Sequence, residues 1–459
     1  MQPPRVPTSN LPGVTWPAVP APAAVTRLAL QYQLAESQWW PPETLLRHQF
    51  QQLSVLLAHA WKTVPFQRQR LKAAGIRPGQ PIGPDEWERL PLLTRQDLQD
   101  SGAALQSRRI PKGHGKAQTV VSSGSTGTPV TTLITELTDF FWQVITLRNH
   151  LWHRRDLTKK FAAIRKFKNP ATNYPQGRMT KSWGASAGLV FATGPSLALS
   201  IAASVEQQVE WLQRQNPGYL LTFPSNLLQL ATHCEQRGIA FPDLVHVLTM
   251  TEILSSEVRD ACRQAWGVPV TDMYSAQEVG YIALQCPDHE HYHVQSEVAL
   301  VEVLDDDGRA CAPGEVGKVV VTALHNFAMP LVRYELGDYA EVGEPCPCGR
   351  GLPVLRRIVG RVRNTLVAPT GERYWPSFGS RKFAELAPIR QHQFVQKTLE
   401  TIEARFVTER ELTPEEEQKL REHILSRLPC PFELTFTYHD EIPRSAGGKY
   451  EDFLSEVAT

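Results

Sequence analysis

A stretch of hydroxyl residues and glycines lies in the first third of the chain, with the order Ser122-Ser123-Gly124-Ser125-Thr126-Gly127-Thr128-Pro129. Glycine lets a backbone approach a ligand closely, and Ser and Thr hydroxyls donate hydrogen bonds to phosphate oxygens. Successive backbone N–H groups in such a loop form a concave anion site. The stretch lacks the Gly-Lys-Ser/Thr ending of a Walker A loop. It indicates either a loop that holds the β- and γ-phosphates of a nucleotide or a hydroxyl-rich surface turn.

Four later stretches place polar or charged side chains beside turn residues. Glu278 closes the sequence Tyr-Ser-Ala-Gln-Glu just after a strand-like segment. Asp338 follows a glycine, where its carboxylate could hold both hydroxyls of a ribose. Arg361 also follows a glycine, and Lys449 follows two glycines near the end of the chain. Each stretch alone is typical of an ordinary turn, so the functional information lies in their order and spacing.

Cysteine and histidine residues form a second, independent pattern. Cys286 is followed closely by His289, His291 and His293, and the pair Cys346 and Cys348 comes later beside a glycine. Two close thiols with a distant Cys/His pair offer a tetrahedral set of soft and borderline metal ligands. The alternative is a group of free cysteines and surface histidines. The remaining cysteines have no such companions and are predicted to be ordinary thiols: Cys234, Cys262, Cys311 and Cys430.

The composition is that of a globular protein with more than one core. The chain has 459 residues, 42% hydrophobic and 21% charged, which is too long for one small core and predicts a large domain with a smaller one. The formal net charge of +1 argues against extensive binding to nucleic acid. No apolar run approaches the length of a membrane span, and the proline-rich start does not resemble a signal peptide. Seven scattered cysteines favour a reducing cytoplasm over a disulfide framework.

Residue patterns place these stretches in alternating elements. Helical spacing or capping signals predict helices over 46–60, from Thr94, over 204–213 and 255–266, and from Thr413. Apolar or alternating runs predict strands over 130–134, 219–223, 245–250 and 432–438, and a hairpin with an Asp-Gly turn over 298–321. The sequence therefore predicts an α/β class: a large layered α/β N-terminal domain with a β-rich subdomain, and a small α+β C-terminal domain.

In this order the stretches resemble the adenylate-forming (acyl-CoA synthetase-like) superfamily, and more closely its phenylacetate–CoA ligase branch. Residues 122–129 match the phosphate loop of that family, and 274–278 resemble its Tyr-Gly-x-Thr/Ser-Glu motif, with Ser275 and Gln277 as departures. Residues 443–449 are similar to its Pro-Arg-Thr-x-x-Gly-Lys motif, with Ser445 in place of Thr. Three stretches near the start resemble the opening of the branch: Val64-Pro65-Phe66, Ala74-Gly75-Ile76 and Leu90-Pro91-Leu92. The resemblance covers residues 45–455.

The resemblance implies a role for each matched residue. Lys449 and Glu278 are expected to be catalytic, and Glu278 also to hold Mg²⁺. The nucleotide-binding residues are expected to be Ser122, Ser123, Gly124, Ser125, Thr126, Gly127, Thr128, Tyr274, Asp338 and Arg361. The family is understood to rotate its C-terminal domain between two half-reactions about a hinge at the position of Arg363, where Asp or Lys is usual. The expected regions are a lead-in over 1–44, an adenylation domain over 45–360 and a mobile catalytic-lysine domain over 361–459.

The implied reaction is ATP-dependent conversion of a carboxylic acid to its acyl-adenylate, followed by transfer to coenzyme A. An aryl or arylacetic acid is the substrate class that the resemblance favours, with Trp142, Phe223 and Tyr281 as candidate wall residues of its pocket. Two alternatives stay open: transfer to an amine or a carrier protein, and a non-catalytic nucleotide-binding scaffold. Some members of the branch also carry a structural zinc site, which implies Cys286, His293, Cys346 and Cys348 as ligands, with His289 or His291 as substitutes. The oligomeric state is not implied.

Overall fold

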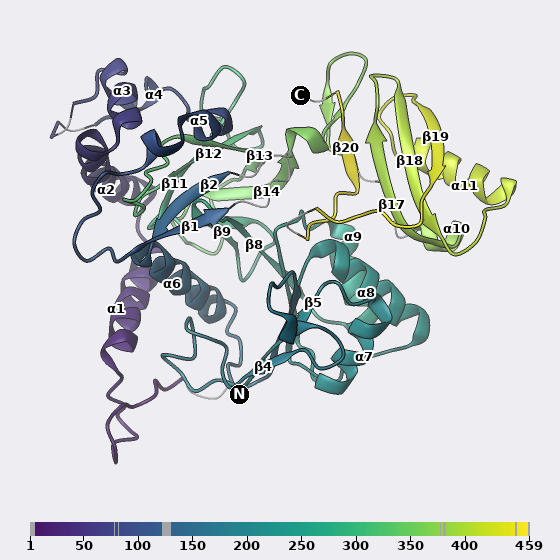
Figure 1. Cartoon of the computed structure of the whole chain (residues 1–459), viewed down its shortest axis with the longest axis horizontal. Coiled ribbons are helices and arrows are strands. Elements are labelled where there is room, and N and C mark those ends of the chain that lie inside the picture. The colour runs from purple at the N-terminus through teal and green to yellow at the C-terminus, as the bar shows by residue number, and fades with distance from the viewer. Residues whose placement is uncertain are drawn as a thin grey trace.

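The computed structural model describes residues 5–77, 79–80, 82–121, 130–376, 378–379, 382–445 and 448–457. The helices are α1 (Pro22–Ser37), α2 (Pro42–Thr63), α3 (Pro65–Ala73), α4 (Pro84–Glu88), α5 (Arg95–Ser101), α6 (Glu136–Trp152), α7 (Val205–Gln215), α8 (Pro224–Arg237), α9 (Ser256–Trp266), α10 (Phe383–Leu386) and α11 (Pro414–Leu425). Short 3₁₀ turns are η1 (Gly102–Leu105), η2 (Pro170–Thr172) and η3 (Val362–Asn364). Figure 1 shows the elements in space.

One mixed sheet of twelve strands runs through the larger part of the molecule. Its strands, in spatial order, are β11 (Ala299–Leu304), β12 (Val316–Ala323), β13 (Tyr334–Val342), β14 (Val354–Arg361), β10 (Tyr292–Val294), β9 (Gly280–Gln285), β8 (Val270–Ala276), β7 (His246–Met250), β6 (Tyr219–Thr222), β3 (Phe161–Arg165), β5 (Ser196–Ser200) and β4 (Arg178–Thr180). The run from β5 through β3, β6 and β7 to β8 is parallel. All pairs from β8 to β11 are antiparallel, so the sheet changes character at β8.

Helices complete the core of each half of this sheet. In the parallel half, α7, α8 and α9 bury apolar residues such as Trp211, Leu227 and Val258 together with strand residues. Figure 1 shows these helices grouped beside β5. Helix α6 packs near β9 and buries Val144 and Ile145 with Tyr281 and Leu284. The antiparallel half has its own core. Together these parts form the predicted α/β layered region with a β-rich subdomain.

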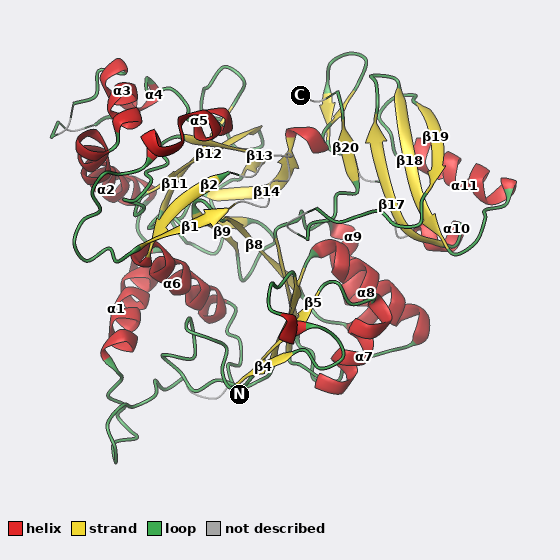
Figure 2. Ribbon diagram, in the orientation of Figure 1, coloured by secondary structure: helices red, strands yellow, loops and turns green. Residues whose placement is uncertain are grey.

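The C-terminal part folds around a separate four-stranded sheet. Its order is β19 (Glu433–Tyr438), β18 (Thr401–Thr408), β17 (Ile389–Gln396) and β20 (Phe453–Ser455), and α10 and α11 lie beside it (Figure 2). Phe394, Phe406 and Leu420 are fully buried in its core. Two-stranded sheets pair β1 (Ala117–Val121) with β2 (Thr131–Thr135) and β15 (Leu366–Val367) with β16 (Arg373–Tyr374). We call residues 5–361 the main body and residues 362–457 the C-terminal module.

Locally encoded elements agree closely with the sequence predictions. Thr94 caps α5 with a hydrogen bond from the Asp97 backbone N–H, and Thr413 caps α11 in the same way from Glu416. The predicted helices over 46–60, 204–213 and 255–266 correspond to α2, α7 and α9, and the four predicted strands to β2, β6, β7 and β19. Strands β11 and β12 pair as the predicted hairpin, and its Asp-Gly turn is followed by a further loop.

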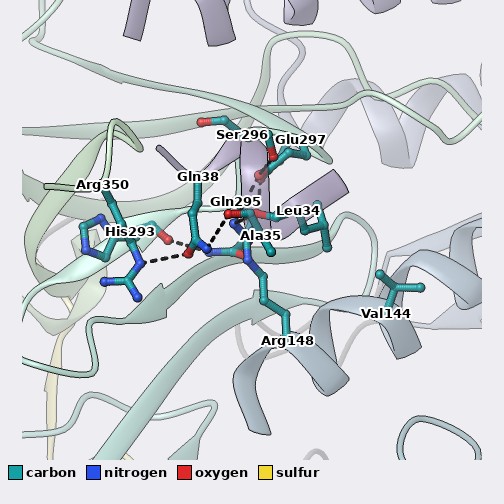
Figure 3. A network of polar contacts seen from close by, with 12 residues as sticks. Leu34, Ala35, Gln38, Val144, Arg148, His293, Gln295, Ser296, Glu297 and Arg350 are labelled. Atoms are coloured by element: carbon teal, nitrogen blue, oxygen red, sulfur yellow. Dashed lines mark hydrogen bonds and ion pairs between the residues drawn. The ribbon is translucent and has the colours of Figure 1, made fainter. Parts of the chain in front are cut away.

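The N-terminal lead-in contains a helix that the sequence analysis did not predict. Arg148 on α6 donates to the Leu34 carbonyl oxygen at 3.1 Å, and it also contacts Gln295 at 3.1 Å and Glu297 at 2.9 Å. Arg350 donates to the Gln38 side-chain oxygen at 3.0 Å. Figure 3 shows this network joining α1, α6 and the segment after β10. Helix α1 is therefore held by contacts to residues far along the chain. Its own sequence shows only weak helical periodicity of apolar residues.

Within the described part of the chain, none of the helices combines the length and the apolar character that a bilayer-spanning segment needs.

We predict that buried histidines make folding stability fall in mild acid. His246 is buried beside Arg155 and Thr271, and burial together with the Arg155 charge lowers its pKa from 6.5 to about 3. Below about pH 6.5 the unfolded chain therefore binds the proton before the folded chain does, which removes up to ~1.4 kcal/mol of stability per pH unit. The thermal midpoint should thus fall less between about pH 7 and about pH 5 in His246→Asn than in the unsubstituted chain.

His439→Asn, at an exposed position of the C-terminal module, is the control. An identical pH slope in His246→Asn and the unsubstituted chain would contradict the assignment.

Candidate functional site

Asp338 lies at the centre of a polar cluster at the edge of the main body. Its carboxylate accepts a hydrogen bond from the Tyr274 hydroxyl at 2.8 Å and pairs with the Arg361 Nε at 3.1 Å. Asp338 and Arg361 are register partners on β13 and β14, and Tyr274 lies on β8. Both members of the ion pair are largely buried, with exposed side-chain fractions of 14% and 23%. The structure thus brings together three residues that are distant in sequence.

Glu278 follows β8 and faces the same cluster. It is 7% exposed, and burial, reinforced by the neighbouring charge of Asp338, raises the pKa of its carboxyl group, while Arg361 and Arg95 act in the opposite direction. Two acidic groups in one buried region favour a bound cation, because a cation would offset the cost of removing their charge from water. The chemistry of this donor set therefore fits the expected magnesium ion.

Lys449 reaches the cluster from the C-terminal module. We call residues 443–450, of which 446 and 447 lie outside the described residues, the lysine loop. Lys449 donates its backbone N–H to the Ser445 hydroxyl at 3.1 Å and accepts from the Ser445 N–H at 2.8 Å, which closes a turn. Burial and then the nearby Arg361 charge lower the pKa of its ammonium group, opposed by Asp338 and Glu252. The loop therefore brings a partly desolvated cation into the field of the Asp338 cluster.

The lysine loop docks on residues of the main body that the sequence analysis missed. Arg444 donates to the Ser225 hydroxyl at 3.0 Å, and the Tyr450 N–H donates to Glu252 at 2.7 Å. Gly448 has a φ of +84°, and a methyl group added to it would lie 3.2 Å from Lys166 Cβ and 3.5 Å from Phe223. Glu252 follows β7 as Glu278 follows β8, so a search for acidic residues at strand ends could have found it.

Trp142 and Tyr281 line one crevice near Glu278. Their ring centroids are 5.0 Å apart, and the crevice, whose free volume is only about 20 Å³, is also lined by Phe141, Gly280 and His325. Phe223, the third expected wall residue, contacts the lysine-loop position of Gly448 and is not among the residues that line this crevice. The structure therefore brings two of the three expected wall residues together and places the third at the contact between the two parts of the chain.

The glycine and hydroxyl stretch from Ser122 to Pro129 lies outside the described residues. Its flanks are the strands β1 and β2, whose register pairs Val121 with Thr131. The segment therefore connects two antiparallel strands. Its role in phosphate binding remains a prediction from the sequence.

Arg363, the expected hinge residue, lies in η3 just after β14. Its guanidinium pairs with Glu451, two residues beyond Lys449. The Asn364 side chain donates to the Phe453 carbonyl oxygen at 2.6 Å. The linker is thus attached to the strand that follows the lysine loop.

The predicted cysteine and histidine residues converge around β10, with Cys286 just after β9 and the Cys346 and Cys348 pair in the segment before β14. Ligand atoms of Cys286, His293, Cys346 and Cys348 all lie within 4.8 Å of one another. Cys286 and Cys346 have sulfur atoms 3.9 Å apart, and His293 Nε2 is 3.5 Å from Cys348 Sγ. Zn–S and Zn–N bonds of about 2.3 and 2.0 Å in a tetrahedron require about 3.8 Å between sulfurs and about 3.5 Å between sulfur and nitrogen. The spacing fits a tetrahedral zinc ion. His291, an expected substitute, instead stacks on His289 beside the cluster.

Sequence comparisons give relatives of one kind. No protein-family model matches the chain. It is 27% identical over 350 residues to a phenylacetate-coenzyme A ligase of Thermus thermophilus, covering 74% of this chain and 75% of the relative. It is 25% identical over 425 residues to a phenylacetate-coenzyme A ligase of Escherichia coli, covering 87% and 92%.

Comparison of structures finds the same fold in a solved CoA ligase. A 2-hydroxyisobutyryl-CoA ligase in its postadenylation state superposes with a TM-score of 0.72 at 19% identity, covering 92% of each chain. The same ligase in its thioesterification state gives a TM-score of 0.59, again with 92% of each chain covered.

We predict that Gly448→Ala separates the lysine loop from the main body. An alanine at positive φ costs about 1 kcal/mol, and the added methyl group also presses on Lys166 and Phe223. Gly371→Ala is a matched control, because Gly371 has a φ of +88° and nothing within 4 Å of its added methyl group. Small-angle scattering should show a larger radius of gyration for Gly448→Ala alone. Equal radii for the two variants would contradict the prediction.

Proposed function

We propose that this chain, an adenylate-forming enzyme of the phenylacetate–CoA ligase branch, uses ATP to convert a carboxylic acid to its acyl-adenylate and passes the acyl group to the thiol of coenzyme A. The observation that carries the proposal is the convergence of Lys449 on the cluster of Tyr274, Asp338 and Arg361. The relatives named above support the same chemistry.

In the first half-reaction, a carboxylate oxygen of the acid attacks the α-phosphorus of ATP, and the bond to pyrophosphate breaks. Such a transfer needs alignment and neutralisation of charge more than covalent catalysis. Lys449 would supply a positive charge to the acid and α-phosphate oxygens, where negative charge accumulates. Mg²⁺ held by Glu278 would neutralise phosphate oxygens when bound. The stretch 122–128 would retain the pyrophosphate through its backbone N–H groups and hydroxyls.

Asp338 and Arg361 would orient the nucleotide. The Asp338 carboxylate would accept hydrogen bonds from the ribose hydroxyls, and the Arg361 guanidinium would contact the ribose and the phosphate. Tyr274 holds the second Asp338 oxygen at 2.8 Å, which fixes the plane of that carboxylate. Because both partners are largely buried, the carboxylate is already oriented before a ligand arrives.

In the second half-reaction, the thiol sulfur of coenzyme A bonds to the acyl carbon, AMP leaves with the electron pair of the C–O bond, and the thiol proton is released. The lysine loop would leave the site by a rotation at Arg363, as the family resemblance implies. We propose an aryl or arylacetic acid as the substrate. The aromatic rings of Trp142 and Tyr281, whose centroids are 5.0 Å apart near Glu278, support this class, although the crevice between them would have to widen to admit the acid.

We also propose a structural zinc ion bound by Cys286, His293, Cys346 and Cys348. Four protein ligands fill a tetrahedral shell, so this ion would have no open position for catalysis. We further propose a reducing compartment such as the cytoplasm, because the cysteines, three of them proposed zinc ligands, are scattered along the chain and form no disulfide in the structure.

The proposed activity is tested by acid-dependent exchange of labelled pyrophosphate into ATP, screened with aromatic, fatty and amino acids. Lys449→Ala should lower the exchange rate by roughly 100-fold or more, because it removes the charge that faces the developing anion. Lys419→Ala, an exposed lysine of the same module, is the control and should leave the rate unchanged. Absence of exchange with every acid would favour a non-catalytic nucleotide-binding scaffold. Consumption of free thiol on adding coenzyme A then distinguishes thioester from amide formation.

If the zinc site is occupied, we expect elemental analysis of the purified protein to find about one zinc ion per chain. Cys348→Ser should lose most of the metal and lower the thermal midpoint, since binding energy of a structural ion contributes to folding. Cys430→Ser, at a half-buried cysteine of the C-terminal module, should retain the zinc ion and the thermal midpoint of the unsubstituted chain. A zinc content near zero in the unsubstituted chain would refute the site.

A further inference from the structure

Glu252 occupies the contact between the two parts of the chain. It follows β7 in the main body, and its side chain is only 8% exposed. One carboxylate oxygen accepts from the Ser225 N–H at 2.9 Å, in the first turn of α8. A helix N-terminus stabilises an anion, so this oxygen is held by the main body itself.

The other oxygen of Glu252 is held by the lysine loop. It accepts from the Tyr450 N–H at 2.7 Å and lies 3.7 Å from the Arg444 guanidinium. Arg444 in turn donates to the Ser225 hydroxyl at 3.0 Å and to the Gly448 carbonyl oxygen at 3.3 Å. These contacts bracket Lys449 on both sides in sequence. The position of the lysine in the site is therefore coupled to the contacts of one carboxylate.

Departure of the loop would leave this carboxylate with only half of its partners. Burial raises the pKa of Glu252, and hydrogen bonds from Tyr450 and Ser225 together with the Arg444 charge act against that rise. A buried carboxylate that loses its hydrogen-bond donors raises the free energy of the protein until water molecules replace those donors. Glu252 therefore favours the docked arrangement by an amount that depends on the lysine loop being in place.

The relative positions of the main body and the C-terminal module indicate which half-reaction the docked lysine loop serves. The chain superposes better on the postadenylation structure of the 2-hydroxyisobutyryl-CoA ligase than on its thioesterification structure, with TM-scores of 0.72 and 0.59 at the same coverage. The two parts of this chain are thus arranged more like the former.

We propose that Glu252 is a positioning residue that clasps the lysine loop for acid activation and releases it for transfer to the thiol. The proposal rests on the proposed function, because it assigns opposite arrangements to the two half-reactions. Glu252 would touch no reacting atom. It acts through Tyr450 and Arg444, which set where Lys449 stands.

The test measures the two half-reactions separately. It uses the carboxylic acid that supports pyrophosphate exchange in the unsubstituted chain. Glu252→Ala should slow pyrophosphate exchange by roughly 10- to 100-fold, the range expected for losing a hydrogen-bonded charge contact. Thioester formation from supplied acyl-adenylate and coenzyme A should change by less than about threefold, because that step does not use the clasp. Arg444→Ala should give the same split, and the double variant should lose less than the product of the single losses.

Two further variants control for folding. Glu252→Gln keeps the shape and one acceptor oxygen, and it should show a smaller loss of exchange with an unchanged thermal midpoint. Asp260→Ala removes an exposed carboxylate of α9 and should leave both half-reactions unchanged.

Equal losses in both half-reactions, or full exchange activity in Glu252→Ala, would overturn the clasp. Absence of exchange in the unsubstituted chain would instead refute the proposed function itself.

Discussion

The ion pair between Asp338 and Arg361 is the constraint on which the rest of the site depends. It joins β13 to the last residue of β14, so it fixes the point at which the main body ends and the linker begins. Tyr274 extends the same contact to β8, where the sheet changes from parallel to antiparallel pairing. The ion pair therefore joins three strands of the main body at the point where the linker to the C-terminal module begins.

Charges of both signs gather around this pair. Burial and then the Arg361 charge lower the pKa of Lys449 against the opposing charge of Asp338, while burial and the Asp338 charge raise the pKa of Glu278. Two cations close together are unfavourable alone, and an anion between them relieves that repulsion. The arrangement thus suits the phosphates of the proposed nucleotide.

The elements that could be predicted from the sequence are those whose signals are local. Thr94 and Thr413 cap their helices through residues three positions away, and β6 ends two residues before Pro224, the first residue of α8. The positions of Asp338, Arg361 and the four metal-binding candidates were predicted because ordered motifs carry them. Glu252 was missed because its role arises only when the Tyr450 N–H, nearly two hundred residues later, reaches it. Helix α1 was missed for the same reason, since its contacts are made by distant segments.

The network around α1 also has a consequence for the order of folding during synthesis. Gln38 is made well before its partner Arg350, which is 312 residues further along the chain. The partners of Arg148 in that network, Gln295 and Glu297, are also made late. Until then α1 has its contacts with α6, such as the hydrogen bond from Gln31 to the Val144 carbonyl oxygen, but it lacks these later contacts, and closing so long a loop is slow. The docking of α1 can therefore be completed only after most of the main body has been made.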